Sequence, residues 1–399
     1  MIKRNILLFA CLLLLVLPFL PLTDYVSAEG ETNTEEVEQT LDDTVTNQLS
    51  QVDLSRLQEF LDNLDDNGQA IFGTTSIWDK VNKLLAGELD ADFATFLSII
   101  LDLLFGNLVN FLPLLCSIIV IGILCNLVGS LSLDGKDSSV GKIIEFVCFG
   151  LVVVIVTSLL YTILNNTSTA IFNIKTQMDA IFPIILTMIA SLGGTVTVGI
   201  FQPTTAILSN IIVQLFSYLI IPLFTFCFIF IVIGNISSNI KLDKFQKLFN
   251  TIFKWVIGTI FGLFSSIMVI QGIVAGSFDS MSIKAAKFAI KSYVPILGGY
   301  LSDGLNFVAI SSILIKNAVG VVGLLLLFGT IISPLIEVIV FSLGLQLVSA
   351  ILEPLGADRI SNFLHQIAKL SNYLITIILA VGFMYVLSVG LLMCTTNLI

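Results

Sequence analysis

Charged residues and histidine are scarce in this sequence. Asp, Glu, Lys and Arg make up only 12% of the 399 residues and apolar residues 56%, against about 25% and about 45–50% in an average soluble protein. Histidine occurs once, as His365 between Arg359 and Lys369, where we expect a solvated surface role. A chain so poor in charge is difficult to keep in water, so the composition argues against an ordinary soluble enzyme.

Sequence motifs for catalysis and cofactor binding are also missing. The chain has no G-x-x-x-x-G-K-[ST], H-E-x-x-H or G-x-S-x-G pattern. Its six cysteines have no C-x-x-C spacing, and we interpret them as small packing residues rather than as disulfides or metal ligands. Without a basic stripe, a nucleic-acid partner is not expected. We therefore predict no catalytic, cofactor-binding or metal-binding residues, and any energy source must come from a partner.

The N-terminus has the pattern of an export signal. Lys3 and Arg4 precede an apolar run from Ile6 to Leu20, and Val26-Ser27-Ala28 places small residues before a cut after Ala28. Residues 1–28 are predicted to be a cleaved signal peptide, with an uncleaved anchor as the alternative. In both cases the residues from 29 onward lie outside the cytoplasm.

Residues 29–92 form an acidic extracytoplasmic region. They hold 16 acidic and three basic residues, a net charge of −13. The composition of residues 29–48 favours disorder. Leu57, Phe60, Leu61 and Leu64 have the spacing of one amphipathic helix, and a second is predicted to open with a capping box at Ser76 and Asp79. Two short helices bury little surface, so we expect this region to pack on the membrane surface or on a partner.

Long apolar segments dominate the rest of the chain and predict an all-α, polytopic membrane protein. Residues 93–110 are predicted to be an interfacial helix, and residues 111–399 a multispan membrane domain with eight or nine crossings. The apolar segments are about 111–131, 143–164, 181–201, 204–236, 252–276, 306–328, 331–352 and 371–394.

The run from Thr204 to Ser237 decides the number of crossings. With Pro222 near its middle, it is either one kinked helix or a tight pair. A pair brings the lysine-rich loop at residues 241–254 inside, as the positive-inside rule favours. That gives nine crossings and a cytoplasmic C-terminus; a re-entrant segment at 181–201 would restore the same parity. The lysines at 284, 287 and 291 then lie outside, on a predicted surface helix.

Lys316 and Glu337 are the ionisable residues well inside apolar segments. A charge at the middle of a membrane helix costs about 2.5–3.5 kcal/mol, so it must face protein or water. For Lys316 we consider an ion pair with Glu337, Asp303 or Glu353, a pore-facing or partner-facing role, and snorkelling to the interface. Two such groups are few for a pump or an ion-coupled transporter.

The segment before Lys316 is predicted to be a rigid turn. Pro295 and the glycine pair Gly298-Gly299 end the surface helix, and Ser302 or Asp303 caps the helix that carries Lys316. We hypothesise that this unit is a docking surface for a partner membrane protein. Glycines at 193–194, 258, 262, 320 and 323 are expected to permit close helix packing, with a broken-helix substrate site at Gly193-Gly194 as an alternative.

Three blocks of sequence carry a family resemblance. Tyr-Val-Pro-Ile-Leu-Gly-Gly-Tyr-Leu-Ser-Asp-Gly spans residues 293–304, Lys316-Asn317-Ala318-Val319-Gly320 follows, and Glu-Pro-Leu-Gly-Ala-Asp-Arg spans residues 353–359. In this order they resemble the stage III sporulation protein AE family of endospore-forming bacteria. The layout of export signal, acidic region and multispan remainder fits as well.

The resemblance implies a non-enzymatic subunit of a channel or secretion-like complex in the mother-cell membrane around the forespore. The implied partners are membrane lipids, other proteins of the stage III sporulation A operon including a cytoplasmic ATPase, and stage II sporulation protein Q across the intermembrane space. The resemblance transfers no catalytic residues. An autonomous secondary transporter or permease is the alternative function, and an intramembrane enzyme is disfavoured because the spans contain few polar groups.

Overall fold

The computed structural model describes residues 34–73, 75–87, 93–131, 139–236, 243–293 and 298–395. These residues form helices joined by short turns, without a strand among them. The all-helical prediction is therefore confirmed. The predicted signal peptide at 1–28 and the predicted turn residue Pro295 lie outside the described residues.

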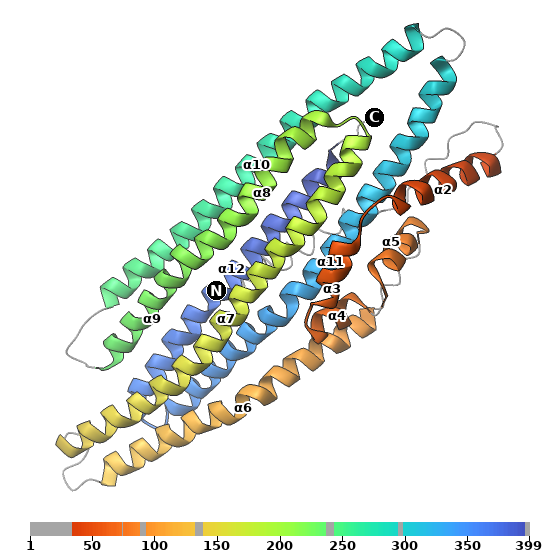
Figure 1. Cartoon of the computed structure of the whole chain (residues 1–399). Coiled ribbons are helices and arrows are strands. Elements are labelled where there is room, and N and C mark those ends of the chain that lie inside the picture. The colour runs from red at the N-terminus through yellow and green to blue at the C-terminus, as the bar shows by residue number, and fades with distance from the viewer. Residues whose placement is uncertain are drawn as a thin grey trace.

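Six long helical rods run side by side in alternating directions (Figure 1). Each is long and apolar enough to cross a membrane. The rods are α6 (Phe93–Leu131), α7 (Ser139–Ser191), the run of α8 (Thr195–Leu215), η2 (Phe216–Ile220) and α9 (Ile221–Ile236), α10 (Asp243–Tyr293), α11 (Gly298–Leu352) and α12 (Asp358–Cys394). The longest, α11, has 55 residues, or about 80 Å at 1.5 Å per residue.

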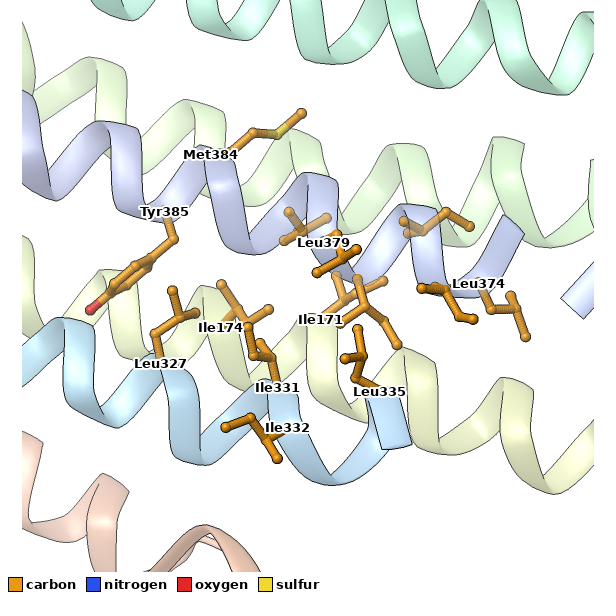
Figure 2. Packing of buried hydrophobic residues seen from close by; sticks show 14 of the residues in the cluster. Ile171, Ile174, Leu327, Ile331, Ile332, Leu335, Leu374, Leu379, Met384 and Tyr385 are labelled. Carbon is orange, nitrogen blue, oxygen red and sulfur yellow. The ribbon is translucent and has the colours of Figure 1, made fainter. Parts of the chain in front are cut away.

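Helices α7, α11 and α12 meet in a closely packed apolar core. Figure 2 shows Ile174 of α7, Ile331 and Leu335 of α11, and Leu374 and Leu379 of α12 pointing toward one another. All five are at most 6% exposed. Water is excluded from this region, so a polar group between these helices needs a hydrogen-bond partner within the chain.

The prediction of eight or nine crossings is not confirmed, because neighbouring apolar segments merge into single helices. Segments 306–328 and 331–352 are both parts of α11, and residues 143–191 lie in α7. Residues 165–179 lie between two predicted spans, yet they stay helical within α7. Among them, the buried Gln177 contacts α11, because its Nε2 donates to the Gly323 carbonyl at 2.7 Å.

The predicted hairpin at Pro222 is wrong, and the kinked-helix alternative holds. Helical structure continues from Thr195 to Ile236 through the π-helical turn η2. The Ile221 amide donates to the Phe216 carbonyl, five residues back. This wide turn immediately precedes Pro222, which lacks an amide hydrogen to donate. The chain reverses instead at Gly193, whose φ of +84° is a left-handed conformation that favours glycine.

Two predicted helices are parts of longer ones. The interfacial helix at 93–110 is the first half of α6, and the lysine-bearing surface helix is the end of α10. Helix α11 begins at Gly298, so Ser302 and Asp303 lie inside it and do not cap it. The sequence pattern located the polar positions but could not show that helical hydrogen bonding continues past them.

The acidic region folds into four helices that pack against α11 and α7 (Figure 1). They are α2 (Thr34–Ser50), α3 (Ser55–Asp62), α4 (Asp66–Phe72) and α5 (Ile77–Leu85). The predicted capping box is confirmed, since Ser76 Oγ accepts from the Asp79 amide at 3.1 Å and donates to its carboxylate at 2.8 Å. Lys80 donates to the Phe72 carbonyl and lies 4.1 Å from the Phe72 ring centroid. Burial lowers the pKa of Lys80 below its usual value.

Disorder was predicted for residues that instead form most of α2. Val45 and Leu49, four residues apart, are buried. Gln48 lies between these two residues in the sequence and contacts α11. Its Oε1 accepts from Ser311 Oγ at 3.0 Å and from Ser312 Oγ at 3.1 Å. The composition of this segment, rich in Glu and Thr, favours disorder, and its buried apolar residues are too few to give a clear helical pattern. Packing of this region on the membrane surface or on a partner stays a prediction; within the chain, α2, α4 and α5 pack on α11.

Basic side chains gather at one end of the bundle. Arg359 pairs with Glu145 at 3.6 Å, and Gln366 accepts from Asn235 and Gln246, which brings the ends of four long helices together there. The lysines at 142, 244, 247 and 254 belong to these same helix ends. The other end holds the Gly193 turn and the C-terminus of α12 (Figure 1).

This arrangement makes a topology prediction. With an exported N-terminus, six crossings put the basic end inside, so Cys at Lys244 or Glu353 should be protected from an impermeant maleimide in intact cells. Cys at Lys284 should react, because it lies near the opposite end. All three positions are exposed. Reaction at Lys244 without reaction at Lys284 would contradict the six-crossing arrangement and its C-terminus outside the cytoplasm.

Candidate functional site: buried polar contacts at helix ends

Lys316 is held at the C-terminal end of α12. Its ammonium donates to the carbonyl oxygens of Met393 at 2.8 Å and Thr395 at 2.7 Å, and the residue is 0% exposed. The last carbonyls of a helix have no partner within the helix and carry its negative dipole end. The Lys316 ammonium on α11 supplies hydrogen-bond donors for these carbonyl oxygens and a positive charge next to the negative end of the helix dipole. Lys316 therefore fastens α11 to the end of α12.

The carboxylates proposed as partners for Lys316 lie too far along the same helix. Glu337 is 21 residues away and Asp303 is 13 residues away, or about 31 Å and about 20 Å along the helix axis. Glu353 follows the end of α11. The predicted ion pair with these groups is therefore wrong, and carbonyl oxygens replace a carboxylate as ligands of the ammonium.

Glu337 contacts α7 instead. Both of its carboxylate oxygens accept from Asn166 Nδ2, at 2.9 and 2.8 Å. The carboxylate is half-buried and lies on the length of α11 that α7 covers. An amide–carboxyl contact of this kind joins two membrane helices through a polar group that each would otherwise leave unsatisfied.

Asp279 is a buried charge that the sequence analysis missed. It is 0% exposed, and its two oxygens accept from the backbone amides of Val196 at 3.0 Å and Thr197 at 2.8 Å. These amides belong to the first turn of α8, where donors lack partners and the helix dipole is positive. A side chain of α10 thus caps α8. Because Asp279 lies just beyond the apolar segment at 252–276, only tertiary structure shows its role.

Glycines allow close contact near these caps. A Cβ on Gly320 would lie 2.4 Å from Met393 Sδ, and one on Gly323 would lie 2.1 Å from Ile181 Cδ1. The Gly323 carbonyl also accepts from the Tyr385 hydroxyl at 3.2 Å. The predicted close packing at these two positions is confirmed. Gly258 and Gly262 lie against open space instead, so packing within the chain does not explain them.

The remaining described residues of the predicted docking unit all lie on α11. Asn317 is half-buried beside Lys316 on α11. Gly298 and Gly299 are the first residues of that helix, and Asp303 follows in its second turn. Helix α11 thus orders them along its length, and the Lys316 ammonium reaches the end of α12.

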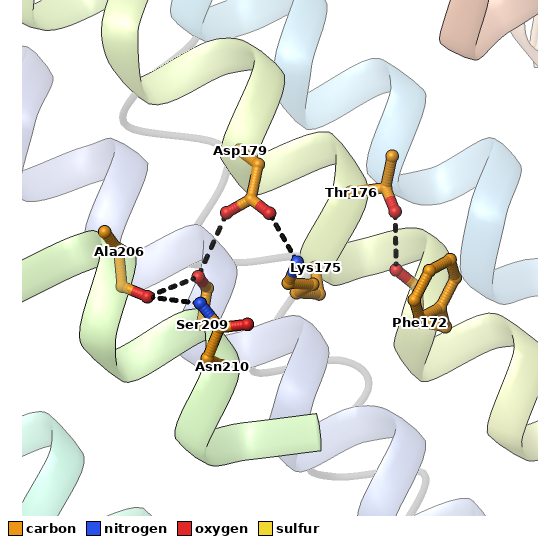
Figure 3. Close-up of polar contacts among 7 residues, drawn as sticks. All are labelled: Phe172, Lys175, Thr176, Asp179, Ala206, Ser209 and Asn210. Carbon is orange, nitrogen blue, oxygen red and sulfur yellow. Dashed lines mark hydrogen bonds and ion pairs between the residues drawn. The ribbon is translucent and has the colours of Figure 1, made fainter. Parts of the chain in front are cut away.

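A second polar cluster joins α7 to α8 (Figure 3). Lys175 and Asp179 form an ion pair at 2.7 Å, with side chains 23% and 42% exposed. Asp179 also accepts from Ser209 Oγ of α8 at 3.0 Å. A groove of about 380 Å³ lies alongside, between α7 and α8, and Asp179, Thr187 and Gln202 are among its lining residues. No local pattern indicates this cluster, because residues 165–180 lie between the predicted spans at 143–164 and 181–201.

The comparisons identify the family. A family model described as stage III sporulation protein AE matches residues 75–396. The chain belongs to the stage III sporulation protein AE family. Stage III sporulation protein AE of Bacillus subtilis (strain 168) is 25% identical over 285 residues, which is 71% of this chain and 71% of that protein. No solved structure matches the chain.

Membership in the stage III sporulation protein AE family fits the chemistry of the contacts described above. Among the described residues, no group of three His, Cys, Asp or Glu side chains is placed to hold a metal ion. The buried charged side chains cap helix ends: Asp279 caps the start of α8, and Lys316 caps the end of α12. These groups stabilise the arrangement of the helices.

Proposed function

We propose that this protein is a non-enzymatic integral membrane subunit of a channel or secretion-like complex in the mother-cell membrane around the forespore. The family match supports a role in sporulation. The observation that supports a subunit rather than an independent machine is the apolar core formed by α7, α11 and α12. A chain whose centre is filled with side chains needs other chains to enclose a conduit.

The two ends of the bundle offer surfaces for the proposed partners. The basic end, with Lys244, Lys247 and Arg359, suits anionic lipid headgroups and the cytoplasmic ATPase of the same operon. The acidic helices α2–α5 are proposed to meet stage II sporulation protein Q in the intermembrane space. Lys316 and Asp279 hold the helix ends nearest that space. In this proposal they preserve a docking surface without themselves touching a partner.

Timed expression and co-purification test this proposal. The protein should accumulate when engulfment begins and should purify from detergent-solubilised sporulating cells with the other membrane proteins of its operon. A matched sample from vegetative cells expressing the same chain provides the control. Purification as a lone polypeptide, together with solute transport after reconstitution by itself into liposomes, would favour the transporter alternative instead.

A further inference from the structure

The surface of α8 has two chemically different sides. Ile207 is 58% and Ile211 39% exposed toward α10, Asn210 is exposed on the edge toward α7, and Gln214 is exposed between Asn210 and Ile207 on the helix surface. Asn210 and Ile211 are adjacent in the same helical turn, so they lie at the same depth wherever the bilayer crosses the bundle. Exposed isoleucine suits lipid, whereas an exposed amide at that depth must face protein or water.

The apolar side of α8 continues onto α10. Gln271 of α10 donates to Thr204 Oγ1 of α8 at 3.2 Å, which fixes the two helices at the same level. Ile270 and Ile273, beside that contact, are 61% and 65% exposed. The outer surface of α8 and α10 is therefore the lipid-facing side of the bundle at this level.

The polar side of α8 continues onto α7. Exposed polar side chains recur there at helical spacing, and with those of α8 they form what we call the α7–α8 polar strip: Asn165, Thr169, Thr176 and Asp179 of α7 with Asn210 and Gln214 of α8. Thr187, also exposed, prolongs it. From Asn165 to Thr187 is 22 residues, about 33 Å, which matches the hydrocarbon thickness of about 30 Å.

The chemistry of the strip favours water over a packed neighbouring helix. Packed membrane helices place small residues and cross-helix hydrogen bonds of Ser, Thr, Asn and Gln at their contacts, whereas this strip also carries a partly exposed ion pair and, on the same face of α7, the 55% exposed ring of Phe172. The Lys175–Asp179 pair leaves it without excess charge at that point. Both charged side chains of this pair (Figure 3) stay partly exposed, and Asp179 lines the groove of about 380 Å³. Charged groups at membrane depth are found facing such water-filled space.

We propose that the α7–α8 polar strip is a water-facing wall of the assembled complex. This inference rests on the proposed function, because another chain of the complex must enclose the water. Within this chain the core of α7, α11 and α12 is filled (Figure 2). The aqueous path therefore runs along the outside of the bundle, between the strip and a neighbouring chain, while α10 faces lipid.

Cysteine accessibility in the assembled complex tests the assignment. Single cysteines are placed at Thr176 and Asn210 in the strip and, as controls on the apolar surface, at Ile211, which is adjacent to Asn210, and at Ile270 of α10, with the native cysteines replaced by alanine. Membranes from sporulating cells are treated with a charged, membrane-impermeant maleimide. The strip positions should react roughly tenfold faster or more, because the thiolate that reacts forms in water and not in lipid.

Equal, slow reaction at all four positions would overturn the inference. So would disulfide cross-links from Thr176 or Asn210 to a neighbouring chain without maleimide labelling, since the strip would then be a packed contact. Co-purification of each variant with the operon proteins is measured in parallel. If the complex is intact while the strip is unreactive, the strip does not face water and the proposed function stands. If no complex is recovered, the proposed function itself is wrong.

Discussion

Replacing Lys316 with leucine should leave membrane insertion intact and abolish assembly of the complex. Removing the ammonium spares a helix-insertion cost of about 2.5–3.5 kcal/mol. It also leaves two carbonyl oxygens at the end of α12 without their donor, and each unsatisfied buried group costs about 1–3 kcal/mol. These effects nearly cancel in total stability. They do not cancel locally, so the end of α12 should fray.

Two measurements separate insertion from assembly. Membrane fractionation should give wild-type amounts of the Lys316→Leu protein, while co-purification of the operon proteins should be lost. Hydrogen exchange of the last turn of α12 should accelerate. Leu314→Ala is the matched control, because Leu314 lies on the same turn but is 39% exposed. Normal co-purification of the leucine variant would reject the docking role of this helix end.

Replacing Asp279 with alanine should cause the largest loss of stability among single substitutions at the outer end. Two amides of the first turn of α8 lose a charged acceptor. Loss of a helix cap costs about 0.5–2 kcal/mol, and buried donors left unsatisfied add about 1–3 kcal/mol each.

Thermal aggregation of the detergent-solubilised protein measures this effect. The midpoint should fall in the order wild type, Asp279→Asn, Asp279→Ala, because asparagine keeps one carbonyl oxygen as an acceptor but loses the charge that favours the helix N-terminus. Ser277→Ala, an exposed change on the same helix, should behave as wild type. If asparagine and alanine at this position destabilise equally, the cap contributes through its charge alone; if neither does, the cap does not stabilise the fold.

The sequence predicted what depends on local patterns. Apolar segments located the membrane helices, and the Ser76–Asp79 spacing located a helix start that the structure reproduces. The positive-inside rule favours a cytoplasmic position for the lysines at 244, 247 and 254. Six crossings from an exported N-terminus place them there without a hairpin at Pro222, because neighbouring apolar segments merge into single helices.

What the sequence could not predict depends on contacts between distant residues. Gln177 remains in a helix because the Gly323 carbonyl, 146 residues away, accepts from it. Asp279 and the start of α8 are separated by 83 residues, and no local spacing links them. A polar residue next to an apolar run indicates a loop in most sequences. Here such residues are the contacts that hold long helices together.

The length of the helices limits how much of this protein a bilayer can cover. A bilayer with its headgroups is about 45 Å thick, so a rod tilted by about 40°, the upper end of the usual range, leaves about 20 Å of the 55-residue α11 beyond the lipid. The part of α11 beyond the lipid is a helix that projects from the membrane. It shortens the distance that a protein anchored in a facing membrane would have to span.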